Sequence, residues 1–371
     1  MWHMSGIHRD VYLFATPKTY VRDHYITSTL DAAAGYNAGT LNVELTMNNR
    51  DAAATNKMVE VQLLSPEGNK LSSQTVEFAF AEGETEKKGI ASIELSDIQL
   101  WSAETPVLYT VEVAQRNANG EEEHVFSTKY GFRHVEIKNK VVYVNGEKVL
   151  FKGANLQDTH PVTGRTIDVP TMLRDVIMFK QSNMNTVRTS HYPNRTEWYH
   201  LCDKNGIYLM DETNLETHGS WQKAGVIEPS YNVPGSWPEW DAVVLDRTKT
   251  HFETFKNHVS ILFWSLGNEE FSIQNQPISK TLMEKMTRVA KRLDDTRPVT
   301  YSGNNGNNFI GANAASEIRG VNYIRNDSGE GGGWLKKYHE DHPNQPIIGT
   351  EESSYVLSRG GAKTNLGASR L

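Results

Sequence analysis

The period of the hydrophobic pattern changes once along this chain, between residues 133 and 140. Before that point, short segments such as TLNVELTMNN, MVEVQLLSPEGN and QTVEFAFAEGE alternate apolar with polar residues, and turn sequences such as Pro-Glu-Gly-Asn separate them. A period of two is typical of strands that bury one face. Roughly seven such strands over about 110 residues predict an antiparallel β-sandwich up to about residue 133, with Trp101 and Tyr109 in its core.

After residue 140, strand patterns and helix patterns alternate. The amphipathic segment TMLRDVIMFKQSN precedes the strand NTVRTS, and the segment KTLMEKMTRVAKRLDD precedes the strand PVTYSG. Seven β-units with helical crossovers predict a parallel sheet. An open, doubly wound sheet and a TIM (β/α)₈ barrel both satisfy this alternation, so the period alone does not choose between them.

The positions of the polar residues favour the barrel. Polar side chains stand at the C-terminal ends of the predicted strands: Asn155, Arg188, His191, Asp211, Asn268, Glu269, Tyr323 and Glu351. A (β/α)₈ barrel gathers these ends on one face, where such barrels carry their active sites. Because the eighth strand cannot be identified, we expect a TIM barrel that is truncated after strand seven.

Two of these polar residues, Glu269 and Glu351, are carboxylates that end two different apolar strands. The strands are SILFWSLGNE and QPIIGTE, and each has a glycine or another small residue shortly before the acid. Two carboxylates at a barrel mouth are the minimum for cleavage of a glycosidic bond, because one donates a proton and the other acts as nucleophile or base. Either glutamate alone also fits a surface-loop carboxylate or half of an ion pair, so only the pair favours catalysis.

Composition excludes several other classes of function. The net charge is −7 and the pI is about 6.0, which gives no basic surface for nucleic acid or anionic membranes. The apolar runs are all shorter than a membrane span. A single cysteine, Cys202, excludes an internal disulfide framework and is expected to be buried. The N-terminus lacks the apolar core of a signal peptide, and the compartment stays open between cytoplasm and periplasm.

Longer motifs add a resemblance to a known family. MFKQSNMNTVRTSHYPN, WYHLCDKNGIYLMDETNLETHG, HVSILFWSLGNEE and QPIIGTEESSYVLSRG resemble successive barrel strands and loops of glycoside hydrolase family 2, and within it of the β-galactosidases. The resemblance covers almost the whole chain. It implies that 1–19 is the end of an N-terminal sugar-binding jelly-roll module, that 20–133 is an immunoglobulin-like β-sandwich and that 134–371 is an incomplete catalytic TIM barrel. We therefore expect a fragment of a larger enzyme.

The resemblance also implies a reaction, the retaining hydrolysis of terminal, lactose-like β-D-galactosides through a covalent glycosyl-enzyme intermediate. It gives Glu269 as acid/base and Glu351 as nucleophile, while strand registry is expected to turn the adjacent Glu270 and Glu352 away from the barrel axis. A retaining mechanism needs the two carboxyl groups roughly 5–5.5 Å apart. The nucleophile must stay ionised, which a cationic neighbour such as Arg188 favours.

Further positions are implied as ligands for the sugar and for a metal ion. The expected sugar-binding residues are Asn268, His191, Arg188, Tyr323 and His160. In NLETHG, Glu216 and His218 are expected to hold Mg²⁺ together with Glu269, with Na⁺ as an alternative ion. Glu-x-His is a weak motif by itself, because a divalent cation accepts many sets of oxygen and nitrogen donors.

Departures from the family pattern leave the substrate open. Gln157 stands where some members have histidine, and ESSY at the end of the last strand lacks a histidine of the best-known bacterial lactases. A β-glucuronidase or β-mannosidase specificity is therefore an alternative, although SHYPN and NLETHG favour galactosides. A carbohydrate-binding fragment without catalytic activity is another alternative, and formation of a homo-oligomer by the full-length enzyme stays open.

Overall fold

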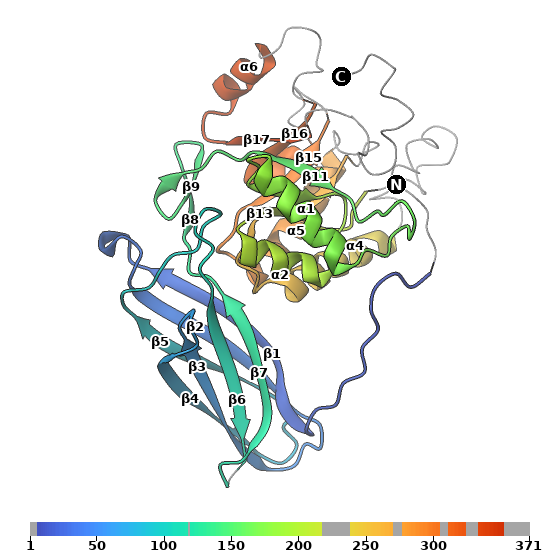
Figure 1. Cartoon of the computed structure of the whole chain (residues 1–371). Helices are drawn as coiled ribbons and strands as arrows, with labels where there is room; N and C mark the ends of the chain where they lie inside the picture. The colour runs from blue at the N-terminus through green and yellow to red at the C-terminus, as the bar shows by residue number, and fades with distance from the viewer. Residues whose placement is uncertain are drawn as a thin grey trace.

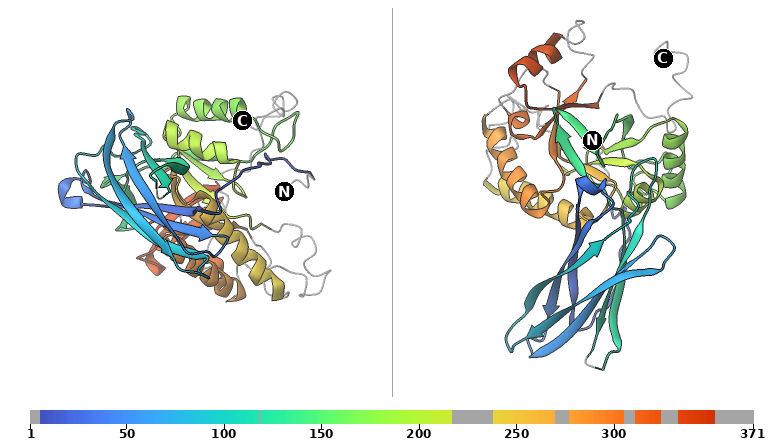
Figure 2. Two further views of the ribbon diagram at one scale, coloured as in Figure 1. Left: turned by 90° about the horizontal axis from the view of Figure 1, so that it is seen from below. Right: turned by 90° about the vertical axis from the view of Figure 1, so that its left-hand side faces the viewer.

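The computed structural model describes residues 6–117, 119–216, 238–269, 277–304, 311–323 and 333–351. In this part of the chain, an antiparallel sandwich precedes a parallel sheet that carries helices (Figure 1). Figure 2 shows the helices of the second part on the outside of its curved sheet. Both predicted parts are therefore present, in the predicted order.

The sandwich consists of two antiparallel sheets with the strand orders β1-β2-β5 and β4-β3-β6-β7. Its strands are β1 (Thr19–Leu30), β2 (Gly39–Asn49), β3 (Thr55–Leu64), β4 (Lys70–Phe80), β5 (Glu86–Leu95), β6 (Tyr109–Arg116) and β7 (Glu122–Tyr130), with the 3₁₀ turn η1 (Ala32–Ala34) after β1. On β3, Val59, Val61 and Leu63 are buried, whereas Glu60 and Gln62 between them are partly exposed. This alternation places one face of each strand in the core and confirms the predicted sandwich.

Of the two aromatic residues expected in the sandwich core, only Tyr109 lies there. Tyr109 is buried in that core, where its ring lies edge-on to Phe132. Trp101 is fully buried in a different cluster at the bottom of the barrel, edge-on to Tyr208, and its Nε1 donates to the Asp203 carbonyl oxygen at 2.8 Å. The expectation for Trp101 was wrong, because the loop between β5 and β6 reaches out of the sandwich and packs against the barrel.

A parallel sheet forms the second part. A small antiparallel sheet precedes it, made of β8 (Val135–Lys138), β9 (Val141–Val144) and β10 (Glu147–Lys148). The parallel strands are β11 (Gly153–Leu156), β12 (Thr186–Thr189), β13 (Tyr208–Glu212), β14 (Ile261–Asn268), β15 (Val299–Gly303), β16 (Ile318–Asn322) and β17 (Ile347–Glu351). The connections carry α1 (Val169–Gln181), α2 (Thr196–Asn205), α4 (Pro238–Phe255), α5 (Pro277–Leu293), η3 (Ala312–Ala315) and α6 (Gly333–Asp341). Among the described residues, none of these helices is long and apolar enough to cross a membrane.

The parallel sheet curls into a nearly closed barrel. Its strands follow in chain order from β11 to β17, and Cα atoms of β11 and β17 come within 8 Å of one another. Every residue of the central strand β14 is buried, as expected for a parallel strand covered on both faces. The barrel, with seven strands in the described residues, is confirmed over the open sheet.

Local signals in the sequence set the helix ends. Asp168 caps α1 by accepting a hydrogen bond from the Thr171 amide, and Pro170 stands in the first turn, where its missing N–H is not needed. Gly206 follows α2 with φ +70°, a left-handed conformation that residues with a side chain rarely adopt. A Cβ on Gly206 would lie 2.3 Å from the Ala103 carbonyl oxygen, so this turn also requires glycine for the close approach of the loop that carries Trp101.

Hydrogen bonds join the sandwich to the bottom of the barrel. Asn257, in the loop before β14, accepts from the Ile26 amide at 2.9 Å and donates to the His24 carbonyl oxygen at 3.1 Å. Arg133 follows the sandwich and donates to the carbonyl oxygens of Val259 and Ile261, both at 2.6 Å. Because these bonds are made to backbone groups, they fix β1 and the segment after β7 against the barrel at defined positions.

Candidate active site

Arg188 lies at the centre of a buried polar cluster at the C-terminal ends of the barrel strands. From β12 it donates to Glu212 Oε2 through Nε at 2.8 Å and Nη2 at 2.6 Å, and to Glu351 Oε1 through Nη1 at 2.8 Å. Nη2 also donates to Asn268 Oδ1 at 2.8 Å. Burial alone would lower the pKa of Arg188, but the negative charges of Glu212 and Glu351 outweigh it and raise that pKa. The guanidinium therefore stays charged and links β12, β13, β14 and β17.

Glu212, the last residue of β13, is the fully buried counter-charge of Arg188. Its Oε1 lies 2.8 Å from His191 Nδ1, and its Oε2 accepts from Ser265 Oγ at 2.7 Å. Burial would raise the pKa of this carboxyl, but the Arg188 charge and the hydrogen bonds from His191 and Ser265 lower it to about 2. Sequence reasoning missed Glu212. The available signal was the pair of acids that closes the strand YLMDE, of which only the first was selected.

Asp211, the acid that was selected on this strand, faces the other way. Its Oδ1 accepts from Tyr199 of α2 at 2.7 Å and from Thr189 at 2.8 Å, and its Oδ2 lies 2.7 Å from His251 Nε2 of α4. Successive side chains of a strand point to opposite faces, so Glu212 points into the barrel and Asp211 points to the helices. The expectation that Asp211 joins the barrel mouth was wrong.

Glu351 ends β17 and has donors on both carboxylate oxygens. Arg188 donates to Oε1, and the Tyr323 hydroxyl donates to Oε2 at 2.6 Å. His191 Nε2 lies 3.6 Å from Oε1. Burial raises the pKa of Tyr323, and the hydrogen bond to Glu351 and the charges of Glu351 and Glu269 raise it further. The phenol therefore keeps its proton and acts as a donor to this carboxylate.

Glu269, directly after β14, is held by Asn322 of β16. Asn322 Nδ2 donates to Glu269 Oε1 at 2.6 Å and to Asn268 Oδ1 at 3.1 Å, while its Oδ1 accepts from Thr350 Oγ1 at 2.6 Å. In the strand register Asn322 is paired with Glu351. One amide thus connects the ends of the two strands that carry the acids. Sequence reasoning missed Asn322 as well, although it directly precedes the selected Tyr323.

Two residues of this cluster have a positive φ, a backbone conformation that residues other than glycine rarely adopt. Glu269 has φ +38° and Tyr323 has φ +61°. A non-glycine residue in this region costs of order 1 kcal/mol or more, and such residues concentrate at functional sites. In both cases the residue directly follows a strand, and its side chain hydrogen-bonds to the side chain of another strand: Glu269 to Asn322 of β16, and Tyr323 to Glu351 of β17.

The expected metal and sugar ligands are only partly brought together. Asn268 Nδ2 donates to Glu216 Oε1 at 2.7 Å, and Glu216 Oε1 lies 3.8 Å from His191 Nε2, so Glu216 belongs to the cluster. His160 lies in the loop after β11, and its Nδ1 accepts from the amides of the same loop. Three positions named from the sequence lie outside the described residues: His218, Glu270 and Glu352.

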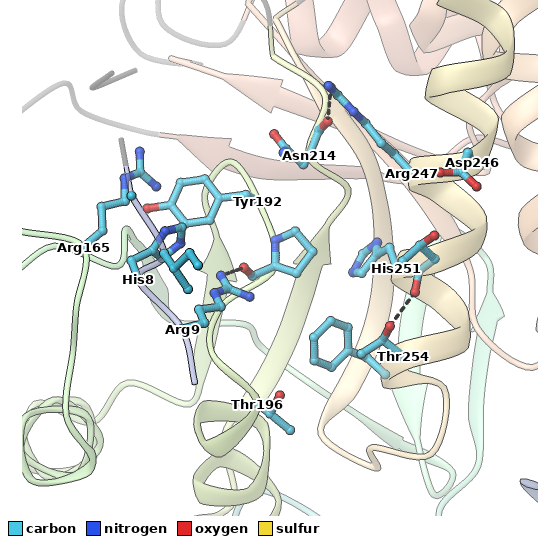
Figure 3. Close-up of a pocket in the computed structure, with 15 residues that line it drawn as sticks. His8, Arg9, Arg165, Tyr192, Thr196, Asn214, Asp246, Arg247, His251 and Thr254 are labelled. Carbon is cyan, nitrogen blue, oxygen red and sulfur yellow. Dashed lines mark hydrogen bonds between the residues drawn. The ribbon is translucent and has the colours of Figure 1, made fainter. Parts of the chain in front are cut away.

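A pocket of about 770 Å³ has a lining different from the cluster around Arg188 (Figure 3). Residues 6–9, the loop with Tyr192 and Pro193, and the helix α4 with Arg247 and His251 line it. None of its described lining residues belongs to the cluster around Arg188, and the pocket holds no pair of facing carboxylates. The convergence of charged side chains at the strand ends, and not cavity size, therefore identifies the candidate active site.

Comparisons with known proteins agree with this architecture. The family model described as "Glycosyl hydrolases family 2, TIM barrel domain" matches residues 135–366, and the model "Glycosyl hydrolases family 2" matches residues 19–133. A β-galactosidase of Clostridium acetobutylicum is 38% identical over 97% of this chain and 37% of its own length. The β-galactosidase large subunit of Latilactobacillus sakei is 40% identical over 80% of this chain and 44% of its own length. The chain thus spans less than half of these relatives.

A solved structure shares the fold. Bacteroides uniformis β-glucuronidase matches with a TM-score of 0.77 at 19% identity, over 90% of this chain and 41% of that one. Identity at this level shows the common architecture alone. The family matches are more specific, because together they cover the sandwich and the barrel in the order found here. This chain belongs to glycosyl hydrolase family 2.

Proposed function

We propose that the barrel mouth is the active site of a retaining β-galactosidase, which cleaves terminal β-D-galactosides. The observation that carries the proposal is the pair of carboxylates on β14 and β17: Glu351 lies between Arg188 and Tyr323, and Glu269 is held by Asn322. Relatives named β-galactosidase, 38–40% identical, support the galactoside. Because the chain spans part of those proteins, the activity of the whole protein is part of this proposal.

In the proposed first step, Glu351 is the nucleophile. One of its carboxylate oxygens forms a bond to the anomeric carbon, and the bond from that carbon to the glycosidic oxygen breaks. Glu269 gives its proton to the departing oxygen. Arg188 and Tyr323 orient Glu351, because each donates to a different carboxylate oxygen.

In the proposed second step, Glu269 acts as the base. It takes a proton from a water molecule, whose oxygen bonds to the anomeric carbon, and the bond to Glu351 breaks. The sugar is released with its original anomeric configuration. His191 is suited to accept a hydrogen bond from a sugar hydroxyl at Nε2, because Nδ1–H donates to the Glu212 carboxylate and the neutral ring then has its lone pair on Nε2. Asn268 and Tyr323 are proposed as further sugar contacts, and His160 as a contact from the loop after β11.

We also propose that a Mg²⁺ ion binds next to this pair, with Glu216, His218 and Glu269 as ligands. The described residues fit a hard cation, because Glu216 and Glu269 supply carboxylate oxygens and both are almost fully buried in the same cluster. Asn268 lies between the two carboxylates. Its Nδ2 donates to Glu216, and its Oδ1 accepts from Asn322, whose amide also donates to Glu269. When bound, the ion would supply positive charge beside the acid/base residue.

Removal of divalent cations is expected to lower kcat for nitrophenyl β-galactoside and to lower the melting temperature. The physical reason is that two buried carboxylates would lose a shared counter-charge. The measurement compares the protein before and after EDTA treatment, and again after addition of Mg²⁺. Glu216→Gln is the matched control and should no longer respond to Mg²⁺. If neither activity nor melting responds in the unmodified protein, the proposed ion is wrong.

The substrate is tested with nitrophenyl β-galactoside, β-glucuronide and β-mannoside at equal concentration. We expect kcat/KM to be highest for the galactoside. Glu269→Gln should lower its turnover by about 10²-fold, the lower end for loss of a general acid, because nitrophenol leaves without much help from a proton. The loss should be larger for lactose, whose leaving group needs that proton.

Two results would overturn this assignment. A preference for glucuronide or mannoside would leave the family intact but exclude the galactoside. Galactose binding by calorimetry, with no turnover of any of the three glycosides, would instead favour a carbohydrate-binding fragment without catalytic activity.

A further inference from the structure

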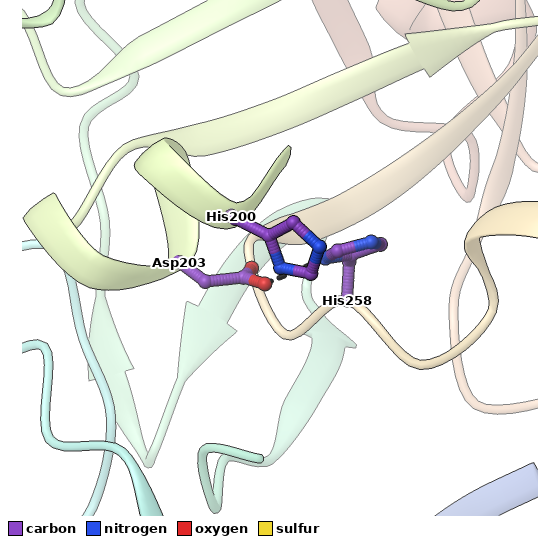
Figure 4. A group of neighbouring side chains, drawn as sticks. All are labelled: His200, Asp203 and His258. Atoms are coloured by element: carbon purple, nitrogen blue, oxygen red, sulfur yellow. Dashed lines mark hydrogen bonds and ion pairs between the residues drawn. The ribbon is translucent and has the colours of Figure 1, made fainter. Parts of the chain in front are cut away.

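Three side chains at the bottom of the barrel form a second cluster (Figure 4). His200 and Asp203 lie on α2, and His258 lies in the loop before β14. One ring nitrogen from each histidine and one carboxylate oxygen of Asp203 all lie within 4.8 Å of one another. The two imidazole rings meet edge to face, with centroids 4.9 Å apart.

Two members of this cluster are held in place by other groups. Asp203 is 2% exposed; its Oδ1 accepts from the Ser260 amide at 2.9 Å, and its Oδ2 lies 2.6 Å from His258 Nδ1. A metal ion bound by both residues would take the place of the proton that Asp203 Oδ2 and His258 Nδ1 share. Each carboxylate oxygen also keeps a further lone pair. Asp203 and His258 are thus arranged before any ligand binds.

We propose that His200, Asp203 and His258 form a binding site for a divalent transition-metal ion such as Zn²⁺. Two imidazoles and one carboxylate suit such borderline ions better than Mg²⁺ or Ca²⁺, which prefer oxygen ligands. A site with three protein ligands leaves the fourth tetrahedral position to water.

His200 is the residue that must move to close the site. Donor atoms around a tetrahedral Zn²⁺ are about 3.3 Å apart, given bonds of about 2.0–2.1 Å, so Asp203 Oδ2 and His258 Nδ1, now 2.6 Å apart, must separate slightly. The nitrogen of His200 must move closer to both, because the ligand atoms are at present spread over up to 4.8 Å. His200 is exposed on a helix surface, and a change of its side-chain torsions achieves this without moving the buried Asp203.

Binding at this position would stabilise the junction of barrel and sandwich. The metal would connect α2 to the loop that carries His258. The two residues before His258 contact the sandwich: Asn257 hydrogen-bonds to the backbone of β1, and Lys256 Nζ lies 2.6 Å from Asp23. Trp101, from the loop between β5 and β6, donates to the Asp203 carbonyl oxygen. A cation here therefore connects elements of both parts of the chain. The role is structural and does not depend on the proposed glycosidase activity.

The test is Zn²⁺ titration of the 371-residue chain by calorimetry, in chelator-free buffer with excess Mg²⁺ to occupy the barrel mouth. The unmodified chain is expected to bind Zn²⁺ and to melt at a higher temperature with it. His200→Ala should weaken Zn²⁺ binding at least about tenfold and remove the rise in melting temperature. His342→Ala, which alters a histidine after α6, is the matched control and should behave as the unmodified chain.

Far-UV circular dichroism and the melting temperature without metal establish that His200→Ala is folded, as expected for an exposed residue. His200→Gln serves as a second variant that keeps a polar side chain, and it should lose affinity as well. Equal Zn²⁺ affinity in the unmodified chain and in both His200 variants would overturn the proposal. The absence of Zn²⁺ binding to the unmodified chain would overturn it equally.

Discussion

Glu351→Gln is expected to lower kcat for nitrophenyl β-galactoside by at least about 10⁴-fold, which corresponds to more than about 5 kcal/mol of transition-state stabilisation. The amide oxygen of glutamine is a poor nucleophile, so the covalent intermediate cannot form at a useful rate. The substitution also removes the negative charge that Arg188 and Tyr323 contact. Both effects act in the first step, and a better leaving group should not restore activity.

The measurement is the initial rate under saturating substrate. Glu352→Gln is the matched control, since it changes the neighbouring acid in the same sequence motif and is expected to keep most of the activity. Proton NMR of the first product distinguishes the stereochemical outcome, and we expect the β-anomer to appear before mutarotation. Unchanged turnover of Glu351→Gln, or early release of the α-anomer, would contradict the nucleophilic role.

Glu212→Gln is expected to destabilise the fold by about 3–5 kcal/mol, the cost of removing one partner of a buried ion pair, and Arg188 would keep only Glu351 as a counter-charge. Arg188 is 4% exposed and makes two hydrogen bonds to this carboxylate, so water cannot replace the lost charge. The measurement is urea denaturation of the unmodified chain and the variant at neutral pH. Glu284→Gln is the control: it neutralises an exposed glutamate whose nearest cation, Lys280, is 3.9 Å away, and it should change stability by less than about 0.5 kcal/mol.

The same residue predicts a dependence of stability on pH. The pKa of Glu212 is about 2 in the folded chain, below the ordinary value of 4.5 that applies when unfolded. A lowered pKa means that the folded state releases this proton more readily, so its contribution is complete above pH 4.5 and is lost as pH falls from 4.5 towards 2. The shift corresponds to about 3 kcal/mol. The stability difference between the unmodified chain and Glu212→Gln should therefore shrink over this range, and a constant difference would contradict the role of Glu212.

The sequence alone predicts the two-part fold, because hydrophobic period reports directly on which faces are buried. Alternation with a period of two required the sandwich, and alternating strands and helices required a parallel sheet. The strand-end positions of Glu269 and Glu351 followed from the same reasoning, since the carboxyl ends of neighbouring parallel strands lie at one edge. The family resemblance supplied the roles proposed for them.

Only the tertiary structure decides which side of a strand end a polar residue faces and which distant group it meets. Asp211 and Glu212 are adjacent in sequence, yet one contacts the helices and the other contacts Arg188, because a shift of one residue reverses the face of a strand. Asn322 gains its role from a contact with an acid 53 positions earlier. Trp101 lies outside the predicted sandwich core, because its loop packs against the barrel. Local pattern encodes burial, whereas these contacts depend on register and on packing between segments far apart in the chain.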